Sequence, residues 1–494
     1  MTTMRTAAEY RASVADGRRV WYQGRVLEDL AAEPITKGLV DSYARWYDWH
    51  SDPEWNDTLW VDGPEGRQPL SFIAPKDVGT LRKLANSIRL VAQQDAGTLS
   101  HTPGYGALIM LGVSDVLASY GESGAAAAAE KYYRSMAAHG RFVTGVYAPA
   151  QTDRFRPPEE RLAVQVVEER DDGIVVDGAL AIGTSLAYSD EVFSAPIPYP
   201  GMPVSQAVWF AFGVNAPGVE MVLRKPASLD QDPFSFPISS RFDEHESALI
   251  LRKVFVPWDR VFAYRAPETC LYLTRAMGWL LLSHLARMLA RYEFSLGLGL
   301  TVTSSLKTSK IPGVTEVLTD LAIQTETLRT ALSASVADAT LSPAGNLLPD
   351  LSHLAVGTLQ GLSGEATVAK TVRTLAGQGV MMAPTQQDLE AGDLQPYIEK
   401  LFGGGELSAH ERSALFHLIT DHTASATEGR VAAFSSLSTG GELLWRRRLR
   451  WAFKQAGHDN ACADLVTKVL RDSTGVDLDI RADFAAEDPR IPGY

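Results

Sequence analysis

The chain has 494 residues, of which 45% are apolar and 21% charged, and its formal net charge is -13. This length predicts two or three domains, and the acidic charge argues against partners such as nucleic acid or an anionic membrane, which need clustered Lys and Arg. The N-terminal residues lack the apolar core of a secretory signal, and the most apolar run, 278–290, is broken by His284 and Arg287, so we expect a cytoplasmic protein without a membrane segment.

Residues 1–140 are predicted to form an N-terminal helical domain. One apolar stripe recurs there at helical spacing, at Leu81, Leu84, Ile88 and Val91. Asp77 and Thr80 are both candidates to cap that helix, because each can accept a hydrogen bond from a free main-chain amide.

The pattern changes to β-structure in residues 141–268. A strand that begins at Leu162 and a return strand that begins at Ile174 flank the turn signal of residues 171–173, which predicts a hairpin. Further β-type runs cover 207–214, 220–224 and 249–256.

A proline-rich segment interrupts these strands. Four prolines fall within residues 194–203, at Pro196, Pro198, Pro200 and Pro203. Proline cannot extend a helix or a central strand. We therefore predict a long loop over about 194–206, of the kind that often covers a binding site.

Helical spacing returns in residues 269–494, where one face carries Leu282, Leu285, Leu289 and Leu296. The order of helices, strands and helices predicts an α+β fold. The sequence shows no internal repeat and no low-complexity linker, so the three parts are expected to pack as one unit.

Motifs for several common chemistries are absent. The two cysteines, Cys270 and Cys462, cannot supply the four thiolates of a zinc or iron–sulfur site within one chain, and no metal site is predicted. No nucleotide-binding glycine motif or nucleophile elbow is present, which disfavours dehydrogenases and α/β-hydrolases. The acidic run 243–246 resembles a metal cluster, but alternate side chains of a strand point to opposite faces, which favours a solvated edge or an ion pair.

Several segments together resemble the oxygenase family of 4-hydroxyphenylacetate 3-hydroxylase. Residues 237–244 read Pro-Ile-Ser-Ser-Arg-Phe-Asp-Glu and residues 256–261 read Val-Pro-Trp-Asp-Arg-Val, both similar to stretches of that family. Further likeness lies, in the same order, at residues 4–10, 172–179, 394–400 and 407–412. The resemblance covers nearly the whole chain.

The resemblance implies an acyl-CoA dehydrogenase-like fold. It has an N-terminal helical domain (1–140), a central β-barrel domain (141–268) with the substrate loop at about 194–206, and a C-terminal helical bundle (269–494) that assembles a homotetramer. It also implies a two-component monooxygenase. Such an enzyme takes FADH2 from a separate NAD(P)H–flavin reductase, uses O2 as co-substrate, and hydroxylates an aromatic ring through a C4a-hydroperoxyflavin.

The stretch Ser100-His101-Thr102-Pro103-Gly104-Tyr105 is the first candidate for the catalytic site. The resemblance aligns His101 with a family arginine and Tyr105 with a family tyrosine. Because an imidazole titrates near neutral pH and arginine does not deprotonate, we expect His101 to supply acid/base or hydrogen-bonding work, with Tyr105 orienting the substrate. The alternative is that His101 has no catalytic role and faces a turn or solvent.

The resemblance also implies contacts to flavin and substrate. Its flavin-binding candidates are Gln151, Arg154, Thr184, Arg287, Gly377 and Gly379. Its substrate-binding candidates are Gly145, Gln378, Tyr199 and Met202. Gly145 stands where the family has a histidine, and we expect it to leave room for a larger substrate. Without the resemblance, Gly377 is as well explained as the cap of a helix.

The substrate positions diverge from the family at His101, Gly145 and Gln378, whereas the flavin positions do not. We therefore expect a non-standard phenol, an indole or pyrrole, or a carrier-tethered aromatic as substrate. N-oxygenation of an amine and a non-catalytic, flavin-binding role are alternatives. A 4-hydroxybutyryl-CoA dehydratase is disfavoured because its cluster needs three cysteines.

Overall fold

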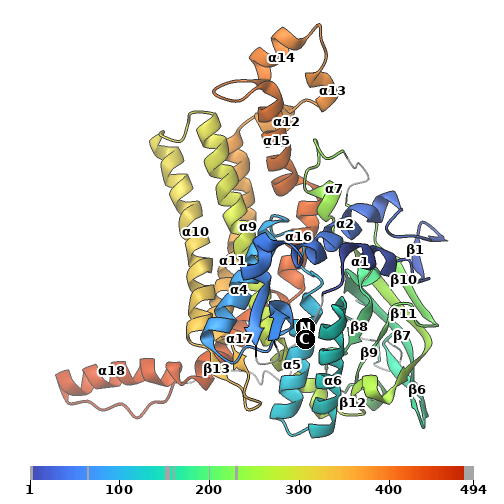
Figure 1. Ribbon diagram of the computed structural model, residues 1–494. Helices are drawn as coiled ribbons and strands as arrows, with labels where there is room; N and C mark the ends of the chain where they lie inside the picture. Colours follow the sequence, from blue (N-terminus) through green and yellow to red (C-terminus); the bar gives the residue numbers. More distant parts are fainter. Residues whose placement is uncertain are drawn as a thin grey trace.

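Helices, then sheets, then helices follow one another along the chain in the computed structural model of this protein (Figure 1). The structure describes residues 4–63, 66–150, 156–157, 160, 162–199, 201–227 and 232–482. One hydrophobic core contains residues of all three regions, from Met4 to Trp445. The regions therefore pack against one another as a unit.

The N-terminal region is built on helices α1 (Ala7–Ser13), α2 (Pro34–Trp49), α3 (Asn56–Leu59), α4 (Val78–Gln93), α5 (Tyr105–Ser119) and α6 (Ser123–His139). The predicted amphipathic helix is α4, which buries Leu81, Leu84 and Val91. Of the two cap candidates, Asp77 is the cap, because its carboxylate accepts from the Thr80 amide at 2.9 Å.

Helix α5 is buried on nearly all sides and lies against the sheets. At its first turn, a Cβ on Gly106 would lie 2.3 Å from the carbonyl oxygen of Val143. Only glycine permits this close approach of a helix to a strand. The contact sets the distance between the start of α5 and strand β5 (Val143–Val146).

The strands of the middle region form two sheets. The larger sheet has the order β2-β1-β10-β11-β7-β6. Its strands are β1 (Val20–Tyr22), β2 (Arg25–Val26), β6 (Gln165–Arg170), β7 (Gly173–Thr184), β10 (Val219–Leu223) and β11 (Glu246–Pro257). The predicted hairpin is β6–β7, in which Arg170 pairs with Gly173. Strand β1 pairs in parallel with β10, so the N-terminal region contributes to this sheet.

The smaller sheet has the order β12-β9-β8-β5, and β5 runs parallel to β8. Its other strands are β8 (Glu191–Ser194), β9 (Val208–Gly213) and β12 (Val261–Tyr264). The predicted central barrel needs a correction, because the described strands do not close. A single bridge between Ala148 and Ile182 joins β5 to the larger sheet, whereas closure requires a continuous ladder.

The C-terminal region is helical, as predicted, with three long helices side by side (Figure 1). Its helices are α8 (Pro267–Cys270), α9 (Gly278–Ser305), α10 (Pro312–Ala337), α11 (Leu351–Ala376), α12 (Gly379–Met382), α13 (Gln386–Leu389), α14 (Gln395–Phe402), α15 (Ala409–Ala424), α16 (Ala426–Leu437), α17 (Gly441–Gln455) and α18 (His458–Thr474). The remaining short elements are α7 (Ser239–Phe242) and the strand pairs β3 (Trp60–Gly63) with β4 (Gly66–Pro69) and β13 (Thr340–Leu341) with β14 (Leu347–Leu348).

Among the residues described, no helix combines the length and the apolar character needed to cross a bilayer. The longest, α9, has 28 residues and buries His284, Arg287 and Arg291 within the protein. These three polar side chains are therefore enclosed by the rest of the chain.

Candidate active site

His101 lies inside the molecule, in the loop that joins α4 to α5. Only 4% of the residue is exposed, and its main-chain amide donates to Glu244 Oε1 at 2.8 Å. Its ring packs on the Tyr105 ring with 3.7 Å between the centroids. The structure thus brings His101 and Tyr105 together and excludes the interpretation that His101 faces solvent.

The loop that carries His101 is held by hydrogen bonds at both of its ends. Asp95 accepts from the amides of Thr98 and Leu99 at 2.8 and 3.2 Å. Burial raises the pKa of Asp95 to about 8, although these hydrogen bonds act in the opposite direction. At the other end, the Tyr105 amide donates to the Thr102 carbonyl at 2.9 Å and opens α5.

Glu244 is the buried anion that organises this loop. Its carboxylate accepts from the Ser100 amide at 2.9 Å, from Ser100 Oγ at 2.6 Å and from Ser185 Oγ at 3.0 Å. Arg430 of α16 lies 2.9 Å away and supplies the opposite charge. Burial alone would raise the pKa of Glu244, but Arg430, His101 and the Ser100 hydrogen bonds lower it to about 2.

The acidic run 243–246 forms ion pairs and no solvated edge. Asp243 Oδ2 lies 3.4 Å from His245 Nε2, and Glu244 and Glu246 both pair with Arg430. Arg224 also pairs with both Asp243 and Glu246, so the run does not divide into two faces as the side chains of a strand would. Of the two structural interpretations left open, the ion pair is therefore confirmed.

The hydrogen bonds around His101 define its tautomer. Ser100 Oγ lies 2.6 Å from Glu244 Oε2 and 2.8 Å from His101 Nδ1. A carboxylate can only accept, so the one hydroxyl proton of Ser100 goes to Glu244 and Nδ1 must carry a proton that it donates to Ser100. This leaves Nε2 of a neutral ring as the acceptor.

Burial keeps this imidazole neutral at pH 7. It lowers the pKa of His101 to about 4, against the opposing effect of Glu244, while Arg430 and Arg287 add to the lowering. Burial also raises the pKa of Tyr105, and Glu244 raises it further. The pair therefore offers one neutral base, His101 Nε2, and one phenolic donor.

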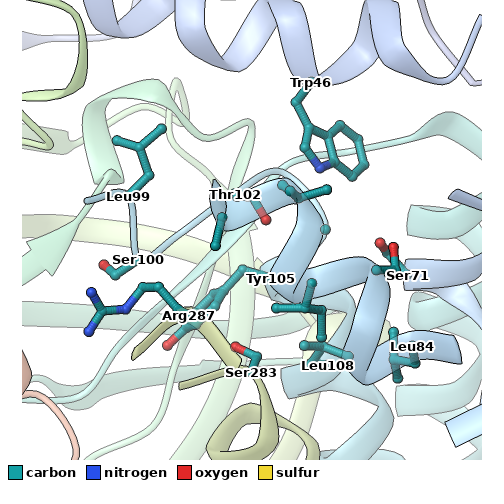
Figure 2. A pocket seen from close by; sticks show the side chains of 15 residues that line it. Trp46, Ser71, Leu84, Leu99, Ser100, Thr102, Tyr105, Leu108, Ser283 and Arg287 are labelled. Atoms are coloured by element: carbon teal, nitrogen blue, oxygen red, sulfur yellow. The ribbon is translucent and has the colours of Figure 1, made fainter. Parts of the chain in front are cut away.

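A pocket lies beside Tyr105 (Figure 2), and its lining includes Ser100 and Thr102 but not His101. Its empty volume, including the mouth, is about 510 Å³. Apolar walls come from Trp46, Leu84, Leu99 and Leu108, and polar atoms from Ser71, Ser87, Ser100, Ser283 and Arg287. In Figure 2, Arg287 of α9 lies beside Tyr105 and Ser100.

Arg287 is a buried cation in the pocket wall. It donates to the Gly97 carbonyl at 2.7 Å and to Ser435 Oγ at 3.0 Å, and its guanidinium faces the Phe434 ring. Among the described residues, no carboxylate forms an ion pair with it. Burial lowers its pKa to about 10, so it remains charged at pH 7.

Of the other residues predicted to bind flavin in the N-terminal half, only Thr184 lies within the described residues. Thr184 is buried at the end of β7, and its carbonyl accepts from Thr144 Oγ at 2.8 Å. The next residue, Ser185, binds Glu244, so Thr184 lies beside the buried network. Gln151 and Arg154 lie outside the described residues.

Gly377 and Gly379 flank an exposed turn between α11 and α12. Gly377 caps α11 with a φ of 66°, as the structural alternative predicted. A Cβ on Gly379 would lie 2.3 Å from the Phe416 ring, which explains a glycine there without a ligand. Gln378 is exposed, and Figure 1 shows α12 far from α5, so one chain does not bring this turn to His101.

The predicted substrate loop joins β8 to β9, as expected. The Tyr199 hydroxyl donates to Gln206 Oε1 at 2.8 Å, and the Met202 amide donates to the Tyr199 carbonyl at 3.1 Å. Met202 packs against the main core. Both candidates therefore belong to a loop with its own hydrogen bonds.

The space beside Gly145 is filled. A Cβ on Gly145 would lie 2.1 Å from the hydroxyl oxygen of Tyr147. The room that the sequence predicted for a larger substrate is thus occupied by a phenol in this structure.

Sequence reasoning missed the residues that position His101. Glu244 stood out as part of an acidic run, but nothing in the sequence connects it with Ser100, Ser185 or Arg430. Tyr147 carried no motif either, although it lies two residues after Gly145 on the same strand face.

The arrangement of helices around two central sheets is an acyl-CoA dehydrogenase-like fold. Two family models match nearly the whole chain, 4-hydroxyphenylacetate 3-hydroxylase N terminal over residues 6–263 and C terminal over residues 272–466. The chain belongs to this family. The predicted family and fold are therefore confirmed.

Named relatives agree with this membership. The oxygenase component of 4-nitrophenol 4-monooxygenase/4-nitrocatechol 2-monooxygenase from Rhodococcus opacus is 27% identical over 483 residues, which cover 94% of this chain and 91% of that protein. The 4-hydroxyphenylacetate 3-monooxygenase oxygenase component of Thermus thermophilus is 28% identical over 453 residues, which cover 88% and 92%.

A solved structure agrees as well. The oxygenase component of 4-hydroxyphenylacetate 3-monooxygenase, complexed with FAD and 4-hydroxyphenylacetate, superposes with a TM-score of 0.87 at 26% identity and covers 95% of this chain and 99% of its own. The predicted enzyme class, a flavin-dependent monooxygenase acting on an aromatic ring, and the predicted cofactor, FAD, are confirmed with the family.

Proposed function

We propose that this chain is the oxygenase component that uses FADH2 and O2 to hydroxylate a non-standard aromatic substrate at the His101–Tyr105 pair. The observation that carries the proposal is a buried, neutral imidazole whose Nε2 is left as an acceptor by the Ser100–Glu244 hydrogen bonds. In the net reaction, the substrate C–H, O2 and FADH2 give C–OH, H2O and FAD.

The residues on this wall fit a flavin. Arg287 is buried without a carboxylate partner among the described residues, and an anionic or electron-rich group such as the flavin pyrimidine edge would offset the free-energy cost of burying its charge. Thr184 lies close by, next to the Glu244 network. When bound, reduced FAD supplies the two electrons that divide O2 between the product and water.

His101 is proposed to act on the substrate. As oxygen adds to the ring, Nε2 accepts the proton of the ring hydroxyl or ring N–H and so raises the electron density of the ring. The Tyr105 ring packs against the imidazole at an interplanar angle of 44° and so restricts its rotation. Leu84, Leu99 and Leu108 give apolar walls to the neighbouring pocket that Tyr105 lines, and such walls exclude bulk water.

The substrate class follows from the divergent positions. Relatives carry names such as 4-nitrophenol and 4-hydroxyphenylacetate monooxygenase, but His101 departs from the family pattern, and at Gly145 the family histidine is replaced by space that Tyr147 fills. A different phenol, an indole or pyrrole, or a carrier-tethered aromatic remains our proposal, with Tyr199 and Met202 of the loop covering it.

Two partners are proposed with this function. A separate NAD(P)H–flavin reductase supplies FADH2, in line with the name "oxygenase component" of the relatives. A homotetramer is supported by apolar side chains left exposed on helices that stand away from the body in Figure 1, namely Met381, Met382, Leu394, Tyr397, Leu401, Leu465, Val466 and Val469.

The test is a product screen. The full chain is incubated with FAD, NADH and a generic flavin reductase across phenols, indoles, pyrroles and amines, and products are read by mass for one added oxygen. The reductase without the chain is the control. Formation of only H2O2 with every compound, with no binding of reduced FAD, would overturn the proposal.

A further inference from the structure

Tyr147 lies where three elements meet. Strand alternation places Val143, Gly145 and Tyr147 on one face of β5 and its continuation. Val143 on that face touches Gly106 of α5, one residue after Tyr105. The same face therefore looks toward the start of α5 and the His101–Tyr105 pair.

The predicted substrate loop begins at the same place. Strands β5 and β8 run in parallel with Val146 paired to Ser194, so Tyr147 emerges beside the first residues of the loop. The Tyr147 ring meets Phe193 edge-on, with 6.2 Å between centroids. Tyr147 thus stands between Tyr105 and the loop.

The hydroxyl of Tyr147 is buried and unsatisfied. Within the part of the chain that the structure describes, its oxygen has no hydrogen-bond partner. Leaving a buried hydroxyl unpaired costs about 1–3 kcal/mol, a cost that phenylalanine would avoid while keeping the packing on Phe193. A polar group at this point is explained if a ligand completes it.

The hydroxyl also takes the place of a side chain at position 145. A Cβ there would lie 2.1 Å from it, so a tyrosine at 147 in this conformation requires a glycine at 145. Burial raises the pKa of Tyr147 well above its ordinary value, and a charge on Tyr105 would raise it further, which indicates that the two phenols are near each other. Tyr147 is therefore a neutral donor at pH 7.

We infer that Tyr147 is a further substrate-binding residue, whose hydroxyl donates a hydrogen bond to the oxygen or nitrogen substituent of the aromatic ring. The inference rests on the proposed function. It names the ligand class more closely, because the substrate must present an acceptor atom on its ring to Tyr147 while its acidic proton faces His101 Nε2. Ring hydroxyl and ring amino groups meet both requirements.

The test is Tyr147→Phe in the full chain, with Tyr133→Phe as the matched control. Tyr133 of α6 also has a buried hydroxyl without a partner among the described residues. Its substitution should therefore change the stability of the protein as Y147F does, but at a position outside the proposed site. We expect Y147F to lower kcat/KM for the best substrate about 10- to 100-fold. It should also divert FADH2 oxidation to H2O2 and leave the melting temperature unchanged or higher, whereas Y133F keeps kcat/KM within about twofold.

A second variant tests the role of the Tyr147 hydroxyl independently. Gly145→Ala places a methyl group against the Tyr147 hydroxyl and should reproduce the loss of kcat/KM in protein that still binds reduced FAD. If wild type is active and Y147F matches Y133F in kcat/KM and H2O2 yield, the role of Tyr147 is wrong and the proposed function stands. If wild type oxygenates nothing and binds no reduced FAD, both are overturned.

Discussion

Two buried arginines of α9, one turn apart, are stabilised in opposite ways. Arg291 pairs with Glu365 at 3.4 Å and with Glu428, both of them carboxylates. Arg287 has a carbonyl and a hydroxyl as its hydrogen-bond partners and borders the pocket. A buried guanidinium that is neutralised by carboxylates of the protein, as in Arg291, holds the fold together. A buried guanidinium without a counter-ion, as in Arg287, is available to a ligand.

The largest expected effect is on stability, from Arg291→Gln. Its removal leaves the half-buried carboxylates of Glu365 and Glu428 without their cation, which costs about 3–5 kcal/mol. Urea denaturation measures the loss. Arg329→Gln is the control, because Arg329 is 40% exposed at the side chain and its ion pairs contribute about 1 kcal/mol or less. Equal losses in the two variants would contradict the comparison.

The next effect is on turnover, from His101→Ala. The main-chain amide of residue 101 still binds Glu244 in this variant, so the loop keeps its position while the imidazole is lost. We expect product formation to fall about 100- to 1,000-fold with reduced FAD still bound, measured by product mass and flavin titration. His139→Ala, at an exposed position of α6, should retain full activity. Normal turnover of H101A would remove the proposed base.

A smaller effect is expected for Arg287→Gln. Because this guanidinium has no carboxylate to leave behind among the described residues, the free energy of unfolding should stay within about 1 kcal/mol of wild type or rise. Binding of reduced FAD should weaken about tenfold, as titration would show. A stability loss as large as that of R291Q would mean that Arg287 is structural.

The smallest effect is a pH dependence of stability. The folded pKa of His101 is about 4, below the unfolded value of 6.5, so the unfolded chain binds more protons between these values and stability falls as pH decreases from 6.5 toward 4. Other buried histidines act in the same direction. The contribution of His101 is therefore the difference between wild type and H101A, expected to shrink by roughly 0.7 kcal/mol from pH 7 to pH 6. A constant difference would show that the ring titrates normally.

Much of the fold was predictable because its signals are local. The cap at Asp77 and the turn at residues 171–173 each act on neighbours a few residues away, and both formed where expected. The barrel was not predictable from such signals. Its closure depends on pairing between strands far apart in the chain, and among the residues described a single bridge joins the two sheets.

The candidate site divides in the same way. His101 and Tyr105 were identified together because they share one short stretch, and they do lie in contact. The resemblance grouped Gln378 with them, yet Gln378 lies exposed in the turn between α11 and α12, away from the pair. Neither Glu244 nor Arg430 was connected with His101, because the burial that pairs them exists only in the folded protein.

The sequence by itself determined the order of helices and strands, the proline loop and the family, since these depend on residue type and spacing along the chain. The tertiary structure alone decided which histidine nitrogen is the acceptor, which arginine has no carboxylate partner in the described part of the chain, and that Tyr147 fills the space at Gly145. The physical reason is that protonation and charge pairing depend on burial and on distances between atoms that only folding brings together.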